Sequence, residues 1–517
     1  MMELQLGHHY LIISQSKFNS GTNMFKDATI EEVNVAVSHS YQAFQQYRKY
    51  SLKQRADLMR AIAIELELCG DELIQTAMNE TNLPEARLRG ERARTIYQLT
   101  SYADACENGD WLDARIDTAI PDKNPPKPDI RKTLIPLGPV VVFGSSNFPF
   151  AYSTAGGDTA CALAAGCSVI IKAHPAHAQT SEIVAQAVHR AIAKNNMPQH
   201  LFTHIHGASF EVGKALVTHT LVKAVGFTGS FSGGKQLFDW GNQRKEPIPV
   251  FAEMGSVNPV FLLKEKLAQS ANDIAKQYAA SVTLGVGQFC TNPGLIIGIK
   301  SEALNQFQTT LQSEIEHIAP AKMLHAGIAK AFFEKRANAL QQSNVALLAK
   351  TKLAADAISG EPTIAKVDAK TFIQNSLLHQ EVFGPYSLLI ECVDENEMLM
   401  VANHLEGQLT STIMATPNDI QSNQTLIDTI KQICGRIILN GVPTGVEVCR
   451  SMMHGGPFPA TTDARFTAVG ADGIKRFARP IAYQNWNNDV LPDELKNENP
   501  LNIWRMVNNE WTKNKIA

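Results

Sequence analysis

The sequence lacks features that would mark several classes of protein. None of its eight cysteines belongs to a Cys-x-x-Cys pair, so their spacing suits reduced thiols better than a disulfide framework or a zinc site. No run approaches the ~18 apolar residues of a membrane helix. The first residues carry neither the basic region nor the long apolar region of an export signal. From these absences we expect a cytoplasmic protein without a membrane partner.

An excess of charge of one sign is also absent. The chain has 47 Lys and Arg residues against 50 Asp and Glu residues, which gives a net charge of −3. Such a balance provides no global field to attract nucleic acid. With 44% hydrophobic and 19% charged residues among 517, the composition is that of an ordinary globular protein with two or three domains.

Helices are predicted for the first part of the chain. The sequence Thr29-Ile30-Glu31-Glu32 has the form of a capping box, in which the side chains of the first and last residues bond each other's free amides. Apolar residues then recur every three or four positions, as on the buried face of a helix. Similar patterns continue to about position 107. The proline-rich segment 121–128 predicts an extended connector, because proline resists helix formation.

After this connector, short apolar strands alternate with helices. The predicted strands are 140–143, 168–171, 201–205 and 224–227, and the predicted helices are 155–166 and 179–195. This alternation favours an α/β fold with a Rossmann-like, doubly wound parallel sheet, whose ligands bind at the carboxyl ends of the strands. A second α/β block, expected from about 259 to 448, has strands near 295–299 and 435–440 and a helix after Ser270.

One cysteine lies in a setting suited to chemistry. Cys290 stands in the run Gly287-Gln288-Phe289-Cys290-Thr291-Asn292-Pro293-Gly294, and Glu253 lies thirty-seven positions upstream at the end of a predicted strand. A thiol acts as a nucleophile when it is reachable and partly ionised. A separate carboxylate can then serve as base for a hydrolytic step. Taken alone, each residue has an ordinary structural explanation, as a small buried side chain or a surface acid.

A glycine-rich segment points to a nucleotide site. Residues 225–235 follow a predicted strand and open a helix, where glycines allow close approach of a pyrophosphate to the helix amides. The spacing differs from Gly-x-Gly-x-x-Gly, so a plain glycine-rich turn remains an alternative.

Three further motifs accompany these: Asn147-Phe148-Pro149, Lys172 and Glu381-Val382-Phe383-Gly384-Pro385. The order of all these motifs along the chain resembles that of the aldehyde dehydrogenase superfamily. The resemblance implies that Cys290 is the nucleophile, Glu253 the general base and Asn147 an oxyanion donor. Ser146 stands where the superfamily usually has tryptophan, which alters packing but not the donor.

The resemblance also assigns cofactor contacts. It places Lys172 at the adenosine ribose, the residues Gly229, Ser230 and Gly234 at the pyrophosphate, Glu381 at the nicotinamide ribose and Phe383 against the nicotinamide. Members that prefer NAD commonly carry a glutamate shortly after the lysine, whereas here the next glutamate is Glu182. We therefore expect NADP, with NAD possible.

Three further features bear on the site. His174 and His177 have no acidic or thiol partner nearby in the sequence, so no metal is predicted there. His454 is interpreted either as a neighbour of the thiol that tunes its pKa or as a turn-stabilising residue. Arg450 and Arg465 are candidates for pairing with a substrate carboxylate.

Segments 155–159, 253–259, 287–294 and 454–463 resemble the branch that contains 2,5-dioxovalerate (α-ketoglutarate semialdehyde) dehydrogenases. The resemblance implies NADP-linked oxidation of that aldehyde to 2-oxoglutarate. The alternatives are a dehydrogenase of long-chain or general aliphatic aldehydes, a coenzyme-A-acylating relative and a non-catalytic nucleotide-binding protein. Family members are dimers or tetramers, so we expect a homo-oligomer.

The expected domains follow the same resemblance. They are a cofactor-binding domain (1–120 and 138–258), a catalytic domain (259–479) and bridging or oligomerisation segments (121–137 and about 480–517).

Overall fold

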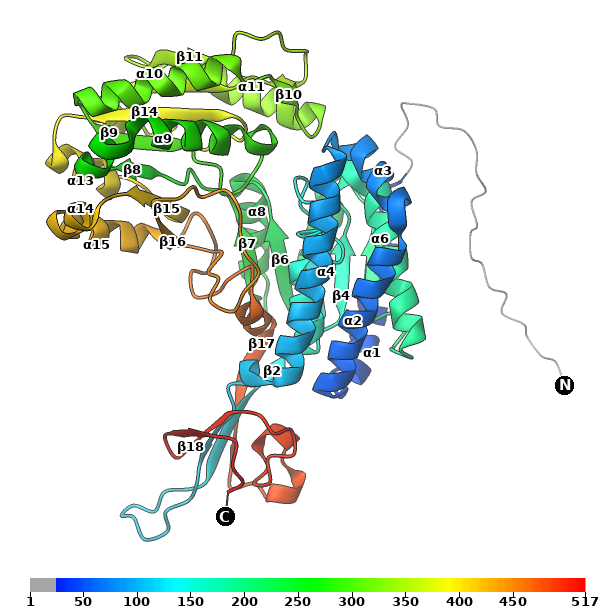
Figure 1. Ribbon diagram of the computed structural model, residues 1–517. Coiled ribbons are helices and arrows are strands. Elements are labelled where there is room, and N and C mark those ends of the chain that lie inside the picture. The colour runs from blue at the N-terminus through cyan, green and yellow to red at the C-terminus, as the bar shows by residue number, and fades with distance from the viewer. Residues whose placement is uncertain (1–24, 517) are drawn as a thin grey trace.

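The computed structural model describes residues 25–516, in which two parallel sheets lie side by side and a smaller sheet projects below them (Figure 1). Four helices open the described chain: α1 (Ile30–Tyr47), α2 (Leu52–Leu68), α3 (Gly70–Thr81) and α4 (Glu85–Asn108). The predicted capping box of Thr29 and Glu32 is confirmed, and Ser51 and Gln54 form a second one before α2. Each box satisfies amides that the first turn of a helix leaves free.

The first parallel sheet has five strands in the order β5-β4-β3-β6-β7. Its strands are β3 (Val140–Phe143), β4 (Val169–Lys172), β5 (Phe202–Ile205), β6 (Ala224–Thr228) and β7 (Val250–Glu253). The helices between them are α5 (Gly157–Ala165), α6 (Ala178–Lys194), α7 (Phe210–Thr218) and α8 (Phe231–Asn242), with the short 3₁₀ turn η2 (Pro175–His177). The expectation of a doubly wound parallel sheet is confirmed.

Helices cover both faces of this sheet. Val140 and Val142 pack with α2, α4, α5 and α6 in one core, whereas Val141 belongs to a second core with α1, α7 and α8. Successive side chains of a strand point to opposite faces, so a strand buried on both sides needs an unbroken apolar run. The run Val140-Val141-Val142 meets that need, and it fixes the end of β3 beside the site.

The second sheet has seven strands in the order β11-β13-β14-β9-β8-β15-β16. All neighbours are parallel except β11 and β13. Its strands are β8 (Val260–Leu262), β9 (Leu295–Ile299), β11 (Ala346–Lys350), β13 (Thr363–Asp368), β14 (Tyr386–Cys392), β15 (Gln408–Met414) and β16 (Cys434–Leu439). The strands expected at 295–299 and 435–440 are therefore present.

Helices and short elements surround the second sheet. The helices are α9 (Lys264–Thr283), α10 (Glu302–His317), α11 (Ala326–Leu340), α12 (Ala369–Gln374), α13 (Glu395–Asn403), α14 (Pro417–Ser422) and α15 (Gln424–Ile433). Two short strands, β10 (Ala321–Lys322) and β12 (Ser359–Gly360), pair with each other, and 3₁₀ turns lie at η3 (Leu284–Gly287) and η4 (Ser376–His379).

The helix expected after Ser270 is present as the second part of α9, but α9 itself starts earlier. The helix begins at Lys264 and continues past Ser270, which itself has a non-helical φ of −145°. Asp419 explains the earlier start, because its carboxylate accepts hydrogen bonds from the Glu265 and Lys266 amides at 3.0 and 2.9 Å. The first turn is thus capped by a residue distant in the sequence.

The third sheet has the order β17-β2-β1-β18-β19 and joins the connector to the C-terminal region. Its strands are β1 (Arg115–Asp117), β2 (Ile130–Pro136), β17 (Ala478–Gln484), β18 (Arg505–Val507) and β19 (Glu510–Thr512). The nearby 3₁₀ turns are η1 (Asp110–Leu112), η5 (Ala471–Phe477), η6 (Asn488–Val490) and η7 (Asp493–Leu495). In Figure 1, β18 and the C-terminus lie at the far end of the projection.

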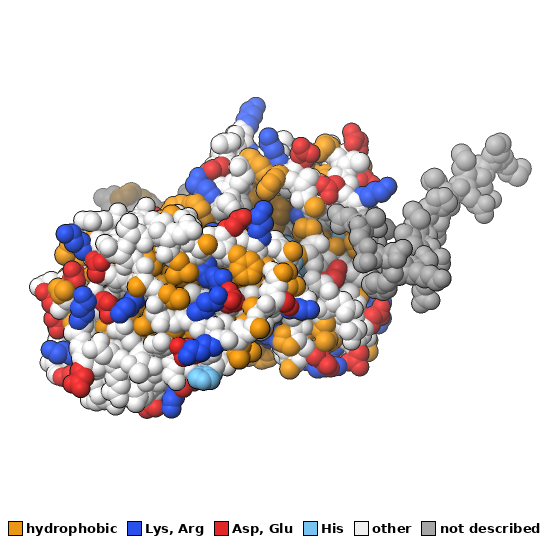
Figure 2. Space-filling view, turned by 90° about the horizontal axis from the view of Figure 1, so that it is seen from above, with side chains coloured by type: hydrophobic (Ala, Val, Ile, Leu, Met, Phe, Trp, Pro, Cys, Tyr) orange, Lys and Arg blue, Asp and Glu red, His pale blue; other side chains and the backbone are white. Residues whose placement is uncertain are grey.

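The surface carries charges of both signs. Figure 2 shows Lys and Arg interspersed with Asp and Glu over one face of the molecule, with apolar side chains between them. Every helix within residues 25–516 is too short or too polar to cross a bilayer.

Candidate active site

The ends of the first parallel sheet bring several predicted site residues to one edge. Asn147 follows β3, Lys172 ends β4, Gly229 follows β6 and Glu253 ends β7. These strands are parallel neighbours, so their carboxyl ends meet where ligands of open α/β sheets bind. The second sheet supplies Cys290 from the loop between η3 and β9.

The backbone before Cys290 is unusual. Gly285, Val286 and Gly287 have φ values of +55°, +59° and +64°, which for a β-branched residue such as Val286 is an outlier. Strain of this kind persists only where surrounding contacts impose it. Asn258 provides such contacts after the turn, because its side-chain amide donates to the carbonyl oxygens of Cys290 and Asn292 at 2.9 Å each.

Cys290, His454 and Glu253 form a continuous polar group. The Cys290 Sγ lies 3.5 Å from His454 Nε2, and the same nitrogen lies 3.1 Å from Glu253 Oε2. The three potential ligand atoms lie within 4.8 Å of one another, so they could also hold a metal ion. His454 comes from the segment between β16 and η5, whose Ala460 carbonyl accepts a hydrogen bond from the Met254 amide at 2.9 Å. The structure thus places His454 beside the thiol. A residue that only stabilised a turn would not need this position.

The electrostatics of the group set the resting state of the thiol. Burial, followed by the negative charge of Glu253, raises the pKa of Cys290 well above its ordinary value. Burial also opposes ionisation of Glu253, but the neighbouring His454 outweighs it and holds the pKa of Glu253 below its ordinary value. At neutral pH the arrangement therefore combines a protonated thiol with an ionised carboxylate, and His454 Nε2 contacts both groups.

Asn147 lies against the loop that carries the thiol. Its side-chain nitrogen donates to the Gln288 carbonyl oxygen at 3.1 Å. A side-chain amide has two N–H donors, so the second remains for a substrate oxygen. The same contact fixes the amide relative to Cys290, two residues further along.

The glycine-rich segment opens α8 as expected. Ser230 is the N-cap and accepts a hydrogen bond from the Gly233 amide at 3.2 Å. The Gly229 amide donates to the Glu253 carbonyl oxygen at 3.0 Å, which ties the loop to the strand that ends at the base. A Cβ at Gly234 would lie 2.4 Å from the Met254 side chain, so this glycine allows α8 to pack closely on the segment after β7. The exposed start of α8 offers free amides to an anion.

Lys172 and Glu381 lie at different parts of the same edge. Burial lowers the pKa of Lys172, and the nearby Asp27 opposes that shift. Burial raises the pKa of Glu381 to about 7. Its carboxylate lies against Gly255, where an added Cβ would be 2.7 Å from the Oε2 atom and where φ is +116°. Phe383 lines a small cavity of about 20 Å³ with Glu381 and Asn292.

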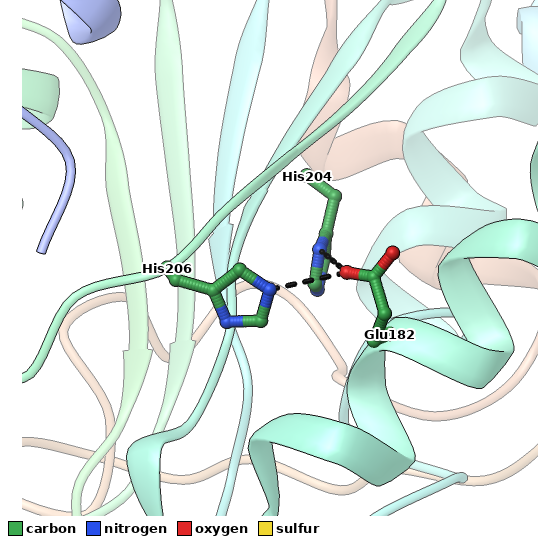
Figure 3. Close-up of side chains that lie close together, drawn as sticks. All are labelled: Glu182, His204 and His206. Atoms are coloured by element: carbon green, nitrogen blue, oxygen red, sulfur yellow. Dashed lines mark hydrogen bonds and ion pairs between the residues drawn. The ribbon is translucent and has the colours of Figure 1, made fainter. Parts of the chain in front are cut away.

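A second polar cluster lies at the end of β5. Glu182 of α6 accepts contacts from His204 Nδ1 at 3.2 Å and His206 Nε2 at 3.1 Å, as Figure 3 shows. Ser181 Oγ lies 2.7 Å from the other nitrogen of His204. Hydrogen bonds from both imidazoles hold the pKa of Glu182 below its ordinary value. The three ligand atoms could hold a metal, but hydrogen bonds among the side chains already account for their positions.

The two histidines considered after Lys172 have other contacts. His177 Nε2 lies 2.7 Å from the Ser145 carbonyl oxygen, and His174 Nδ1 accepts a hydrogen bond from the Ala176 amide at 3.2 Å. Their rings stack with centroids 5.3 Å apart. Both residues therefore support the backbone around the sheet edge.

A cleft of about 710 Å³ leads to Cys290. Arg87 and Arg94 of α4 and Arg436 of β16 line it, together with aromatic residues that include Phe148, Tyr152 and Phe289. Sequence reasoning missed these arginines. The spacing of Arg87 and Arg94 is a helical one, but the pattern does not reveal which helix face meets the thiol.

Arg450 and Arg465 lie outside the lining of this cleft. Arg450 pairs with Asp110 at 2.9 Å, and Arg465 pairs with Asp463 on the surface. Each is already bound to a carboxylate of the chain itself.

The chain belongs to the aldehyde dehydrogenase family. The model of that family matches residues 19–457, which include the first sheet, Glu253 and Cys290.

Among characterised relatives, the chain is 45% identical to the alpha-ketoglutaric semialdehyde dehydrogenase of Acinetobacter baylyi over 493 residues, 95% of this chain and 93% of the relative. It is 44% identical to alpha-ketoglutaric semialdehyde dehydrogenase 2 of Azospirillum brasilense over 484 residues, 93% of this chain and 92% of the relative.

Solved structures share the fold. One is a glyceraldehyde-3-phosphate dehydrogenase of Methanocaldococcus jannaschii complexed with NADP, with a TM-score of 0.74, 20% identity, and coverage of 89% of this chain and 95% of that one. A 1-pyrroline-5-carboxylate dehydrogenase from Thermus with bound NAD also has a TM-score of 0.74, with 19% identity and coverage of 89% and 86%.

Proposed function

We propose that this aldehyde dehydrogenase oxidises 2,5-dioxopentanoate (α-ketoglutarate semialdehyde) to 2-oxoglutarate, with Cys290 as nucleophile. The chemistry is supported by the continuous group of Cys290, His454 and Glu253 and by the cleft that Cys290 lines. The choice of aldehyde is supported by the 45% and 44% identical relatives, which carry the name of this activity over nearly their whole length.

The proposed reaction begins at the thiol. The Cys290 thiol transfers its proton to His454 Nε2, which leaves Glu253 ionised for the later step, and the thiolate adds to the aldehyde carbon to form a thiohemiacetal. The oxyanion that develops accepts hydrogen bonds from Asn147 and from the Cys290 backbone amide. When bound, the nicotinamide supplies the acceptor for the hydride that leaves this carbon.

The second half of the reaction is hydrolysis. Oxidation leaves the acyl group on Cys290 as a thioester. Glu253 then takes a proton from water as the water oxygen adds to the acyl carbon. The C–S bond breaks, which releases the carboxylic acid and the thiolate. The presence of a carboxylate within 3.1 Å of His454 supports release to water over transfer to coenzyme A.

The residues at the sheet edge fit a dinucleotide. The exposed start of α8 suits a pyrophosphate, Lys172 suits the ribose or phosphate of the adenosine half, and Glu381 and Phe383 suit the nicotinamide half. We favour NADP, since no carboxylate directly follows Lys172 in the sequence. NAD is the second candidate, because the fold brings the Glu182 carboxylate to the end of β5, the neighbour of β4.

A dehydrogenase of aliphatic aldehydes is the second candidate function. The apolar part of the cleft, with Phe148, Phe289 and Met452, favours it. The decisive measurement compares 2,5-dioxopentanoate, a long-chain aldehyde and a short aliphatic one, each with NAD and with NADP, by the absorbance of the reduced cofactor. We expect the highest kcat/KM for 2,5-dioxopentanoate with NADP. Absence of reduction with every aldehyde would favour a non-catalytic nucleotide-binding protein.

The same proposal extends to organisation. We infer a cofactor-binding domain (1–120 and 138–258), a catalytic domain (259–479) and bridging segments (121–137 and about 480–517). All eight cysteines are free, which suits a reducing compartment such as the cytoplasm. The projecting third sheet is the proposed contact between copies in a dimer or tetramer.

A further inference from the structure

Two guanidinium groups line the cleft from separate elements without a carboxylate partner. Arg94 lies on α4 and Arg436 on β16, and both line the cleft that ends at Cys290. Within residues 25–516, no Asp or Glu oxygen approaches either guanidinium within 4.0 Å. An arginine stays charged in proteins, so the cleft holds two positive charges that form no ion pair with a carboxylate of the described chain.

Backbone carbonyls hold both groups in place. Arg94 Nη2 donates to the Val446 carbonyl oxygen and the Tyr152 hydroxyl, each at 3.3 Å. Arg436 donates to the carbonyl oxygens of Pro443 and Gly445 at 3.1 and 3.2 Å. Both arginines thus bind one segment, residues 443–446, which itself lines the cleft. The two charges are positioned relative to each other before any ligand binds.

Each of these side chains also keeps a buried donor without an acceptor. Arg94 Nη1 and Arg436 Nε are buried and have no hydrogen-bond partner. A buried donor without a partner lowers stability, and the cost is larger when the group is charged. An anion in the cleft would relieve this cost, because the planar fork of arginine matches a carboxylate.

Arg87 provides a contrast within the same cleft. Its Nη1 atom lies 2.7 Å from Glu91 Oε2, so its charge is already paired. Its guanidinium lies over the Phe148 ring at 4.5 Å, where it forms part of the wall. Only Arg94 and Arg436, among the arginines of the cleft, combine a free charge with a free donor.

We propose that Arg94 and Arg436 together form the binding site for the carboxylate of the aldehyde substrate and thereby determine specificity for short keto-acid aldehydes. This inference rests on the proposed function. In 2,5-dioxopentanoate four carbon–carbon bonds separate the carboxylate carbon from the aldehyde carbon, so one end can reach the arginines while the other meets Cys290. An uncharged aliphatic aldehyde leaves both guanidinium groups without a counter-charge.

The test removes each charge and compares two substrates. Arg94→Met and Arg436→Met are assayed with 2,5-dioxopentanoate and with pentanal, an uncharged aldehyde of the same chain length. Loss of a charged hydrogen bond corresponds to about a 10- to 100-fold increase in KM for the keto acid, with little change in kcat/KM for pentanal. Arg94→Lys retains the charge and recovers part of the loss. Arg450→Met removes an equal charge from an exposed ion pair outside the cleft and leaves the kinetic constants for both substrates unchanged.

The outcomes separate this inference from the proposed function. Wild-type protein that reduces NADP or NAD with neither aldehyde overturns the function and the inference together. Equal losses for both substrates in folded Arg94→Met and Arg436→Met leave aldehyde oxidation standing and overturn the carboxylate site. If a methionine variant does not fold, the corresponding lysine variant is assayed in its place. The inference then requires a higher KM for the keto acid and little change in kcat/KM for pentanal.

A binding measurement checks the site without turnover. Isothermal calorimetry of 2-oxoglutarate with the wild-type protein gives a Kd, which Arg94→Met and Arg436→Met raise about 10- to 100-fold for the same reason. Arg450→Met leaves it unchanged. Equal Kd values in the wild type and both methionine variants would exclude these arginines as carboxylate ligands.

Discussion

At the scale of single residues, the Cys290 thiol meets two opposing requirements. It must ionise to attack an aldehyde, yet burial and the Glu253 carboxylate raise its pKa well above the ordinary value. The contact of His454 Nε2 with both Cys290 and Glu253 resolves the conflict, because it offers a path by which the thiol proton leaves when a substrate is present. In the proposed reaction, the carboxylate that suppresses ionisation in the resting state acts as the base for hydrolysis of the acyl-enzyme.

Substitution of Glu253 separates these two effects. Glu253→Gln removes a negative charge beside the sulfur, so the pKa of Cys290 falls and alkylation by iodoacetamide at pH 8 becomes faster than in the wild type. Hydrolysis of the acyl-enzyme loses its base, so steady-state turnover falls by about 10²- to 10⁴-fold, while the first burst of reduced cofactor persists. Glu447→Gln, which removes a charge from the rim of the same cleft, is the control. Slower alkylation in Glu253→Gln would show that Glu253 is needed to ionise the thiol.

Glu381 gives a second prediction, on pH dependence. Burial raises the pKa of this carboxyl to about 7, so the group is largely protonated at pH 6 and ionised at pH 8. Only the ionised form can accept hydrogen bonds from both ribose hydroxyls through its two oxygens. The Kd for NADP, measured by fluorescence quenching, therefore falls as the pH rises from 6 to 8. In Glu381→Gln this dependence disappears, and a dependence that persists would assign it to another group.

Residues in local motifs could be predicted from the sequence, whereas residues brought together by packing could not. The segments around Asn147, Lys172, Glu253 and Cys290 each lie at the end of a strand or in a turn that neighbouring residues encode. Arg94 and Arg436 line one cleft because both hydrogen-bond to residues 443–446, a segment distant from α4 in the sequence. The two arginines chosen from the sequence, Arg450 and Arg465, instead pair with acids that the fold places beside them.

At the scale of elements, two loops that carry site residues are in direct contact. Gly287, at the end of η3, lies against the backbone of Gly384 in the segment that carries Glu381 and Phe383. The start of α9, which leads to the same loop, depends on Asp419 of α14. The loop that carries Cys290 is thus coupled through backbone packing to the segment proposed to hold the nicotinamide. Capping by a residue so distant in the sequence cannot be predicted from the pattern within one helix.

Gly287→Ala tests this coupling. A Cβ at this position would lie 2.3 Å from the Gly384 carbonyl group, and φ is +64°, so neither the space nor the backbone suits alanine. We expect the free energy of unfolding to fall by at least about 1–3 kcal/mol, together with weaker NADP binding. Gly90→Ala is the matched control, since nothing lies within 4 Å of its added Cβ in α4 and helix propensity favours alanine by about 0.5–1 kcal/mol. Thermal unfolding of both variants measures the difference, and equal melting temperatures would contradict the coupling.

At the scale of the whole molecule, the third sheet is the part with the least cover. It projects away from the two larger sheets (Figure 1), and its outer strands β17 and β19 have free edges within the described chain. Trp486, Trp504 and Trp511, in and beside these strands, are each about half exposed. Free strand edges and exposed aromatic side chains mark surfaces that pair with another chain. These features support a second copy as the partner of the projection.

Size measurement with a charge introduced on the projection tests the assembly. The wild-type protein is expected to elute in gel filtration with light scattering at a multiple of the 56.6 kDa chain mass. Trp511→Glu places a charge where an apolar contact is expected, and burial of an unpaired charge is costly, so the distribution shifts toward monomer. Leu68→Glu, a substitution at an exposed apolar position on α2, leaves the size unchanged. Because Cys290, His454 and Glu253 all come from one chain, the Trp511→Glu monomer retains the alkylation kinetics of its thiol, and a monomeric wild type at micromolar concentration would refute the proposed contact.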